Sequence, residues 1–160
     1  GYSVPVASGV HGQVVSFCDG SDVTVSLFAD GSAEPKYTVS VPGGTKDSSG
    51  QYTTTYDIPE VAPGTYTMQV SKKNHVTREY TVTVSGDVKT QDAKIHLMGD
   101  INGDGRISIG DINQANLHAK GKKILLGYEL ACADINGDGR VTTSDVNKMN
   151  LHNKGKSLLW

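Results

Sequence analysis

The chain has 160 residues, enough for one medium-sized domain or two small ones. Its net charge of −2 gives no indication of a nucleic-acid partner or of an anionic membrane surface. No run approaches the roughly 18 apolar residues of a membrane span. The first residue is Gly1 rather than a methionine, so we expect a segment of a longer mature protein.

Residues 9–98 show the alternation of apolar and polar side chains that is typical of β-strands. Turn residues such as Asp19-Gly20 and Pro63-Gly64 separate the alternating segments. Short strands at this spacing predict a small all-β sandwich. The predicted strands are Val10–Phe17, Val23–Phe28, Tyr37–Val41, Tyr52–Ile58, Thr65–Ser71, Arg78–Val84 and, as a last strand, Ala93–Leu97.

The stretch VAPGTYTMQVSKKNHVTREYTVTV (Val61–Val84) resembles the carboxypeptidase-regulatory-like, transthyretin-like sandwich. The segments VHGQVV near the start and SSGQYTTTYDI in the middle extend this resemblance. It implies an immunoglobulin- or transthyretin-like fold. In the sandwich, Tyr66, Met68 and Val70 alternate on one strand and are expected to point to the core.

From about Gly99 the pattern changes to Asp/Asn/Gly loops followed by helical stretches, so we predict a sandwich over residues 1–97 and a second, small all-α domain over residues 98–160. Cys18 and Cys132 are expected to be unpaired, buried, small apolar residues, although a disulfide that joins the two halves stays open. We expect Trp160 to pack near His96–Gly99, with a disordered terminus as the alternative.

Two segments of the second half repeat each other at an offset of 34 residues. DINGDGRISIGDINQANLHAKGKKILL (100–126) aligns with DINGDGRVTTSDVNKMNLHNKGKSLLW (134–160), and 16 of these 27 positions are identical. Identity at this level over a fixed offset indicates a duplicated structural unit.

Each repeat opens with a twelve-residue loop whose oxygen donors stand where an EF-hand loop needs them to bind calcium. Gly105 and Gly139 occupy position 6, where the turn is too sharp for a Cβ. Position 12 is Asp in both loops, where many EF-hands have a longer Glu. The sequence therefore predicts two Ca²⁺ ions, held by Asp100, Asn102, Asp104, Arg106, Ser108 and Asp111, and by Asp134, Asn136, Asp138, Arg140, Thr142 and Asp145, with both arginines contributing their carbonyls.

Two amphipathic helices, roughly Ile109–Lys120 and Thr143–Lys154, are predicted after the loops. Their outward faces repeat a leucine beside a histidine, which is unusual unless a partner covers them. The alternative is that both leucines cover a small local core. The outward residues are Gly110, Gln114, Leu117, His118 and Gly121 in the first helix, and Ser144, Lys148, Leu151, His152 and Gly155 in the second.

No helix is predicted to enter the loops, since Lys94–Gly99 (KIHLMG) before the first has strand character. A loop with only an exiting helix, repeated in tandem with a GDINGDG start and a short connecting segment Lys122–Ala133, resembles the dockerin modules of cellulosome-type assemblies. The resemblance covers Gly99–Trp160. With the sandwich upstream, the whole chain resembles the X-module–dockerin pair of a cellulosomal protein. The NLHxKGK helix ends are similar to those of ruminococcal dockerins.

This resemblance implies a non-catalytic, secreted or cell-surface module that binds a cohesin through the outward helix faces, together with Ile109 and Thr143 at loop position 10. The sandwich would support the dockerin. No nucleic acid, membrane or small-molecule substrate is expected. The sequence also shows none of the constellations that nucleophilic or phosphate chemistry needs, so no enzyme is expected.

Two other classes of function stay open. One is a carbohydrate-binding sandwich with a structural calcium tail, whose stacking platform would need the tyrosines, although these could instead fill the core. The other is an extracellular calcium sensor, against which the lack of entering helices and of a Met-rich groove argues. The strand tyrosines are Tyr37, Tyr52, Tyr56, Tyr66 and Tyr80.

Overall fold

The computed structural model describes residues 9–160, which divide into two compact units. The first unit contains the described residues up to Val15 together with Asp19–Lys73 and Thr77–Ile95. The second contains Ser16–Cys18, Asn74–Val76 and His96–Trp160. None of the helices within residues 9–160 is long and apolar enough to cross a membrane.

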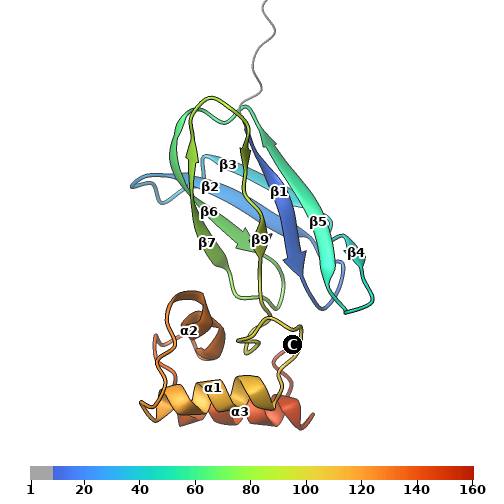
Figure 1. The fold of residues 1–160 in the computed structure, drawn as a ribbon, viewed down its shortest axis with the longest axis vertical. Helices are drawn as coiled ribbons and strands as arrows, with labels where there is room; N and C mark the ends of the chain where they lie inside the picture. The colour runs from blue at the N-terminus through green and yellow to red at the C-terminus, as the bar shows by residue number, and fades with distance from the viewer. Residues whose placement is uncertain (1–8) are drawn as a thin grey trace, which may run out of the picture. The chain divides into compact units, whose positions relative to one another are not determined.

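Two β-sheets form the first unit (Figure 1). One sheet has the order β4-β5-β1-β8, with β9 also paired to β1, and the other has the order β3-β2-β6-β7. β1 runs parallel to β8 and β9, whereas β2, β3, β6 and β7 pair antiparallel. The strands are β1 (Gly9–Ser16), β2 (Val23–Ala29), β3 (Tyr37–Val41), β4 (Thr45–Lys46), β5 (Tyr52–Pro59), β6 (Gly64–Ser71), β7 (Arg78–Val84), β8 (Lys89–Thr90) and β9 (Ala93–Lys94).

The core of this unit follows from the alternation along each strand. In β6, Tyr66, Met68 and Val70 are buried, as predicted, while Thr67 and Gln69 between them are half-exposed. Successive side chains of a strand point to opposite faces of the sheet, so the apolar ones share one face. The apolar faces of the two sheets pack together and form a single buried cluster. The sandwich is therefore held mainly by apolar burial between its two sheets.

The predicted strand Ala93–Leu97 is too long. Only Ala93 and Lys94 pair with β1, opposite Val14 and Val15. Beyond them, Leu97 forms an isolated antiparallel bridge with His75. Ile95 and Leu97 are apolar because packing buries them, although they lie beyond the last paired residue of β9.

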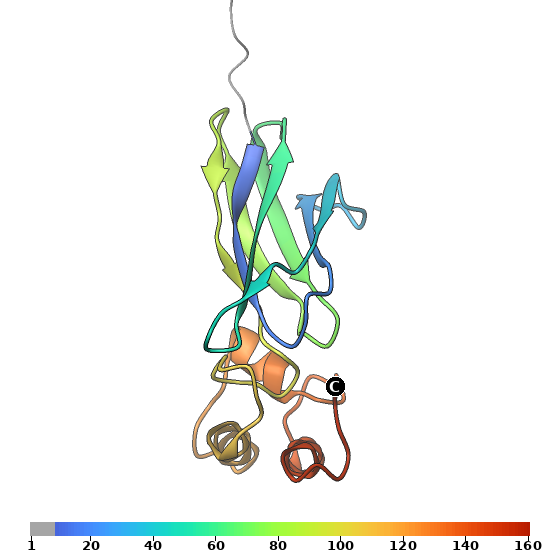
Figure 2. The same cartoon turned by 90° about the vertical axis from the view of Figure 1, so that its right-hand side faces the viewer.

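Three helices form the second unit, and α1 and α3 lie side by side (Figure 2). α1 spans Ile109–Ala119 and α3 spans Thr143–Asn153, each one residue shorter than predicted. α2 (Gly127–Ala133) lies in the segment predicted as a connection. The buried core of this unit includes Ile112 and Ala115 of α1 and Met149 of α3. Ala119 and Val146, on the same helices, are half-buried.

The prediction that no helix enters either loop is correct for the first loop and wrong for the second. The first loop is preceded by a turn, in which the Asp100 N–H donates to the Leu97 carbonyl. Before Asp134, α2 ends at Ala133, so the second loop stands between two helices. Seven helical residues are too few for a periodic apolar stripe to identify from the sequence. Tertiary burial of Cys132 and Ala133 holds α2 in place.

The two cysteines form no disulfide with each other. Cys132 is buried, as expected, but Cys18 is exposed, which corrects the prediction. Cys18 follows β1 in the turn to β2 and has a positive φ of 78°. Its side chain is carried outward by this turn rather than inward by the alternation of a strand.

Trp160 lies where the sequence predicts. Its indole Nε1–H donates to the Met98 carbonyl at 2.9 Å, and its ring lies 4.4 Å from that of His152, measured between centroids. This bond joins the final residue of the chain to the segment that precedes the first loop.

Candidate functional site

Two clusters of aspartates lie at the starts of α1 and α3. Asp100, Asp104 and Asp111 form one cluster, in which the carboxylate oxygens lie within 4.8 Å of one another. The other, equally tight, consists of Asp134, Asp138 and Asp145. Positions 1, 5 and 12 of both predicted calcium loops therefore converge. The first loop here denotes Asp100–Asp111 and the second loop Asp134–Asp145.

Each loop winds around the carboxylate at its first position. Asp100 accepts backbone N–H bonds from Gly103, Asp104 and Gly105 at 3.0, 3.1 and 2.8 Å. Asp134 accepts the equivalent bonds from Gly137, Asp138 and Gly139 at 3.0, 3.2 and 2.8 Å. The duplicated sequence thus forms a duplicated geometry.

The aspartate at position 12 connects the loop to its helix. Asp111 Oδ1 accepts the N–H of Asn102 at 3.0 Å, while Oδ2 accepts the N–H of Ser108, the residue that caps α1, also at 3.0 Å. Asp145 makes the same connection from Asn136 and Thr142, at 3.2 and 2.9 Å. An acidic side chain in the first helical turn also stabilises the positive end of the helix dipole.

The remaining predicted ligands take positions consistent with the loop pattern. Asn102 Oδ1 accepts the Asp104 N–H at 3.2 Å, and Asn136 Oδ1 accepts the Asp138 N–H at the same distance. The Arg106 side chain is 80% exposed, with Nε 3.8 Å from Asp104 Oδ2, and Arg140 is also exposed. Neither guanidinium occupies the loop interior, which leaves the arginine carbonyl as the part that can serve there.

Burial sets the electrostatics of the first loop. It raises the pKa of the Asp100 carboxyl from 3.8 to about 7, although the N–H of Gly105 opposes the shift, and nearby Asp111 adds to it. Burial likewise raises the pKa of Asp111. Two buried carboxylates this close favour a bound proton or a bound cation over two bare charges. An all-oxygen donor set of carboxylates and amides suits a hard cation, and calcium accepts about six to eight such oxygens.

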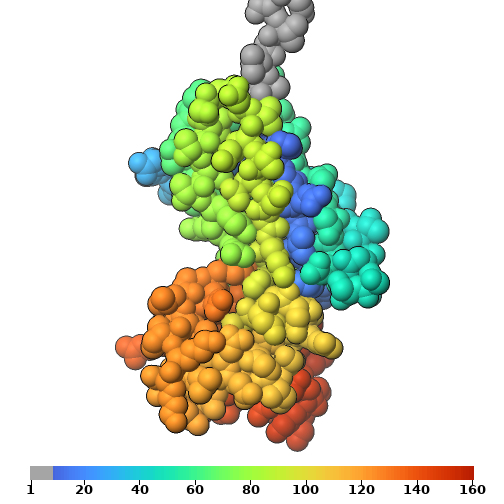
Figure 3. Space-filling view, in the orientation of Figure 1, coloured from blue at the N-terminus to red at the C-terminus, as the bar shows by residue number. Residues whose placement is uncertain are grey.

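The outward faces of α1 and α3 are accessible. Figure 3 shows the surface of the second unit with α1 in front. Leu117 is 38% exposed and Leu151 is 41% exposed, so neither leucine is enclosed in a local core. Of the other predicted docking residues, Ile109, Gly110, Gly121, Thr143, Ser144, Lys148 and Gly155 are exposed, and Gln114, His118 and His152 are half-buried.

The two outward histidines also have a structural role that the sequence analysis missed. His118 Nδ1 accepts the N–H of Leu125, and His152 Nδ1 accepts the N–H of Leu159, both at 2.9 Å. Each imidazole therefore holds the segment that follows its helix, with Nε2 as the remaining ring nitrogen. The seven-residue spacing between histidine and leucine, which occurs in both repeats, is the sequence feature that could have indicated this role.

Other exposed apolar residues lie in the segments after the helices. Ile124 is 62% exposed and Leu126 is 74% exposed, and after α3 Leu158 is 67% exposed. Ile124 and Leu158 occupy equivalent positions of the repeat. They add apolar surface in both halves of the duplicated unit, beyond the residues that were predicted.

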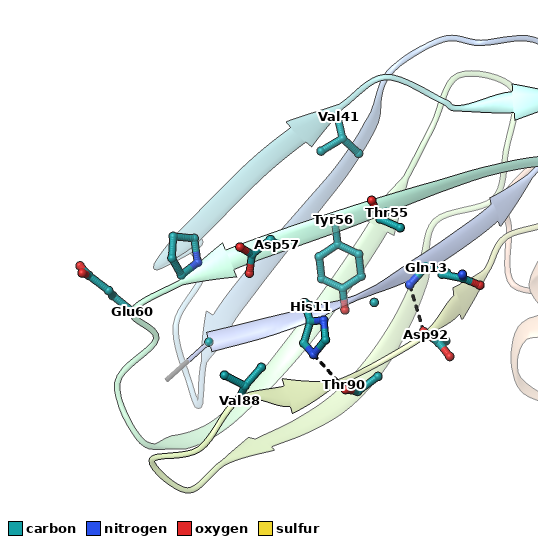
Figure 4. Close-up of a pocket in the computed structure, with 13 residues that line it drawn as sticks. His11, Gln13, Val41, Thr55, Tyr56, Asp57, Glu60, Val88, Thr90 and Asp92 are labelled. Carbon is teal, nitrogen blue, oxygen red and sulfur yellow. Dashed lines mark hydrogen bonds between the residues drawn. The ribbon is translucent and has the colours of Figure 1, made fainter. Parts of the chain in front are cut away.

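The sandwich carries a groove of about 1190 Å³ on its first sheet (Figure 4). His11, Asp57 and Asp92 are among the residues that line it. Tyr56 contributes the only phenol ring among the described lining residues, and it is 2% exposed with its hydroxyl bonded to the Gln91 carbonyl. Among these residues, the groove therefore offers no open phenol, phenyl or indole face on which a sugar could stack.

Comparison with known families gives one match. Residues 98–152 match the model of the family described as Dockerin type I domain. No curated protein sequence matches the chain significantly.

Two solved structures illustrate the similarity to known folds. A chain in the crystal structure of an N-terminal interface mutant of a type II cohesin–X-dockerin complex from Acetivibrio cellulolyticus has 22% identity and a TM-score of 0.38, over 91% of this chain and 94% of that one. A C-terminal interface mutant of such a complex from the same organism gives 20% identity and a TM-score of 0.35, over 90% and 95%. At these TM-scores the similarities do not establish a shared fold, so the family match is the comparison that bears on function.

Proposed function

We propose that the chain, whose residues 98–152 match the dockerin type I model, is a non-catalytic, calcium-dependent docking module that binds a cohesin. The observation that carries this proposal is the duplicated loop and helix. Each acidic loop is bonded through its last aspartate to the start of a helix whose outer face exposes a leucine. An ion bound in the loop would therefore fix the helix that carries the docking surface.

Two Ca²⁺ ions are proposed, one in each loop. The carboxylates of Asp100, Asp104 and Asp111 would hold the first, with Asn102, Ser108 and the Arg106 carbonyl completing the set. Asp134, Asp138 and Asp145 would hold the second, with Asn136, Thr142 and the Arg140 carbonyl. Calcium supplies the charge that balances these convergent carboxylates, which otherwise repel one another.

Residues 1–97 are proposed to act as an X-module and residues 98–160 as the dockerin, in a secreted or cell-surface protein of a cellulosome-type assembly. The supporting observations are the two-sheet sandwich and the family match. Millimolar calcium outside the cell would fill loops of modest affinity.

The cohesin surface is proposed to combine the outer faces of α1 and α3 with loop positions 10 and 11. Exposed Leu117 and Leu151 are its apolar anchors, and Ile109, which is 60% exposed, extends it at the start of α1. Burying these exposed apolar groups against a partner is favourable.

The direct test is binding of the full chain to a panel of cohesins, with calcium and with excess chelator. We expect one or more cohesins to bind only when calcium is present. Insoluble polysaccharide serves as the second arm, because pull-down on polysaccharide without cohesin binding would support the carbohydrate-binding alternative. A chain that binds neither would contradict the proposal.

A further inference from the structure

The two acidic loops have the same internal hydrogen bonds but different surroundings. The three bonds that each first aspartate accepts agree within 0.1 Å between the loops. Burial, however, differs: Asp100 is 0% exposed, while Asp134 is partly exposed. Gly103 is buried, whereas its counterpart Gly137 is exposed. Sequence repetition therefore does not make the two loops equivalent.

Two aromatic side chains account for the difference. A Cβ on Gly105 would stand 2.7 Å from Cδ1 of Phe17, and a Cβ on Gly103 would stand 2.5 Å from Nε2 of His96. Both rings thus pack directly on the backbone of the first loop. A Cβ on Gly137 or on Gly139, the equivalent positions of the second loop, would meet no atom of residues 9–160 within 4 Å, apart from its own chain neighbours.

Both rings are fixed within the second unit. Phe17 is 1% exposed, its N–H donates to His75 Nε2 at 3.0 Å, and its ring is stacked on that of His75. The N–H of His96 donates to the Tyr128 hydroxyl at 2.8 Å, and the two rings meet edge to face. The cover over the first loop is therefore held by hydrogen bonds and by ring contacts.

We propose that the side chains of Phe17 and His96 cover the first loop in the folded protein. Calcium therefore leaves the first loop more slowly than it leaves the second loop, and it binds the first loop more tightly. This inference rests on the proposed calcium function. A loop already held in shape loses less conformational entropy when the ion binds. Exclusion of water also strengthens the attraction between the ion and its carboxylates. Release from a covered loop requires the cover to loosen first.

The consequence is an order of unloading. As calcium falls, the second loop empties first, and the start of α3 loses its support while α1 keeps its own. The docking surface would then pass through a state in which only the α1 half is organised.

The test compares two variants of the full 160-residue chain, each with a single intact loop. Asp138→Ala leaves the first loop, and Asp104→Ala leaves the second. After loading with calcium, each variant is mixed rapidly with a fluorescent chelator, and the release rate is recorded. We expect calcium release from the first loop to be slower by about tenfold or more, because the cover must loosen before the ion leaves. A tenfold difference in rate needs only a modest increase in the barrier to release.

Phe17→Ala then identifies the cause. Added to Asp138→Ala, it should raise the release rate by about tenfold, whereas added to Asp104→Ala it should leave the rate unchanged. A second comparison covers the case in which Phe17→Ala fails to fold. Gly103→Ala and Gly137→Ala both replace a glycine with a similar positive φ, 74° and 72°, but only the first meets a ring. Gly103→Ala should therefore weaken calcium binding to its own loop more than Gly137→Ala does.

Equal release rates from the two single-loop variants would overturn the inference, as would equal effects of Phe17→Ala on both loops or of the two glycine substitutions. Each of these three results leaves the calcium-dependent function intact, because both loops would still bind the ion. Failure of the unsubstituted chain to bind calcium would instead contradict the proposed function itself, and the inference with it.

Discussion

Trp160 contributes to stability through two separable interactions. Trp160→Phe keeps an aromatic ring but removes the N–H that bonds to the Met98 carbonyl, which should lower the free energy of unfolding by about 1 kcal/mol. Trp160→Ala also removes the apolar contact and should lower it by about 2–4 kcal/mol. Thermal unfolding in calcium measures both. Leu158→Ala is the control, because this side chain is 67% exposed. A melting temperature unchanged in Trp160→Ala would contradict the assignment.

The buried carboxyl of Asp100 predicts a pH dependence of the calcium-free protein. Its pKa is raised from 3.8 to about 7 by burial, so the folded state binds this proton more tightly than the unfolded chain does. Its contribution to stability is therefore complete below about pH 4 and lost as the pH rises through about 7. Without calcium, the helical circular-dichroism signal of the second unit should therefore be retained near pH 4 and lost as the pH rises through about 7, and Asp100→Asn should reduce this change. A pH dependence of the helical signal that is unchanged in Asp100→Asn would exclude this carboxyl as its source.

At the scale of elements, hydrophobic periodicity in the sequence predicted the helices and strands that are long enough to show a period. β3 and β7 match their predicted bounds, and α1 and α3 differ by one residue. The two-residue strands β4 and β8 and the seven-residue α2 are too short to show a period. Their backbone hydrogen bonds and burial come from segments distant in the sequence.

In the candidate site, too, local features could be predicted from the sequence and long-range packing could not. The spacing of oxygen donors within twelve residues predicted which aspartates converge, because a loop is a local structure. The cover over the first loop could not be predicted, since Phe17, which follows β1, lies far from Gly105 in the sequence. A repeat with such similar loop sequences conceals this difference in burial, which only tertiary packing creates.

The outer faces of α1 and α3 predict one dominant orientation of the bound cohesin. Leu117 and Leu151 are equivalent, but loop position 10 is Ile109 in one repeat and Thr143 in the other. A pocket that buries Ile109 would leave the Thr143 hydroxyl unpaired in the rotated orientation, at a cost of about 1–3 kcal/mol. Such a difference corresponds to a preference of about ten- to a hundredfold.

Single leucine variants test this preference without disturbing His118 and His152, which hold the segments after the helices. Cohesin affinity is measured for Leu117→Ala, for Leu151→Ala and for both together. One dominant orientation requires one single variant to lose most of the affinity and the other little. If both single variants bind well and only the combination fails, the module binds in two orientations.

At the scale of the whole molecule, calcium is expected to stabilise the second unit far more than the sandwich. Each loop, when calcium exceeds its dissociation constant about 100-fold, adds about 2.7 kcal/mol to the folded state. Two loops together approach the total stability of a small domain, about 5–15 kcal/mol. The sandwich has its own apolar core between two sheets and contains neither loop. Loss of calcium should therefore unfold the helices and leave most of the strands.

Circular dichroism of the full chain distinguishes the two contributions. Excess chelator should remove most of the helical signal of α1, α2 and α3 while the β-sheet signal persists, and added calcium should restore the helices. A chain with both Asp104→Ala and Asp138→Ala is the matched control, since it should show the chelated spectrum even in calcium. Helical signal that persists in excess chelator would mean that apolar packing around Ile112, Ala115 and Met149 alone holds the unit together, and that the loops bind calcium without organising the helices beside them.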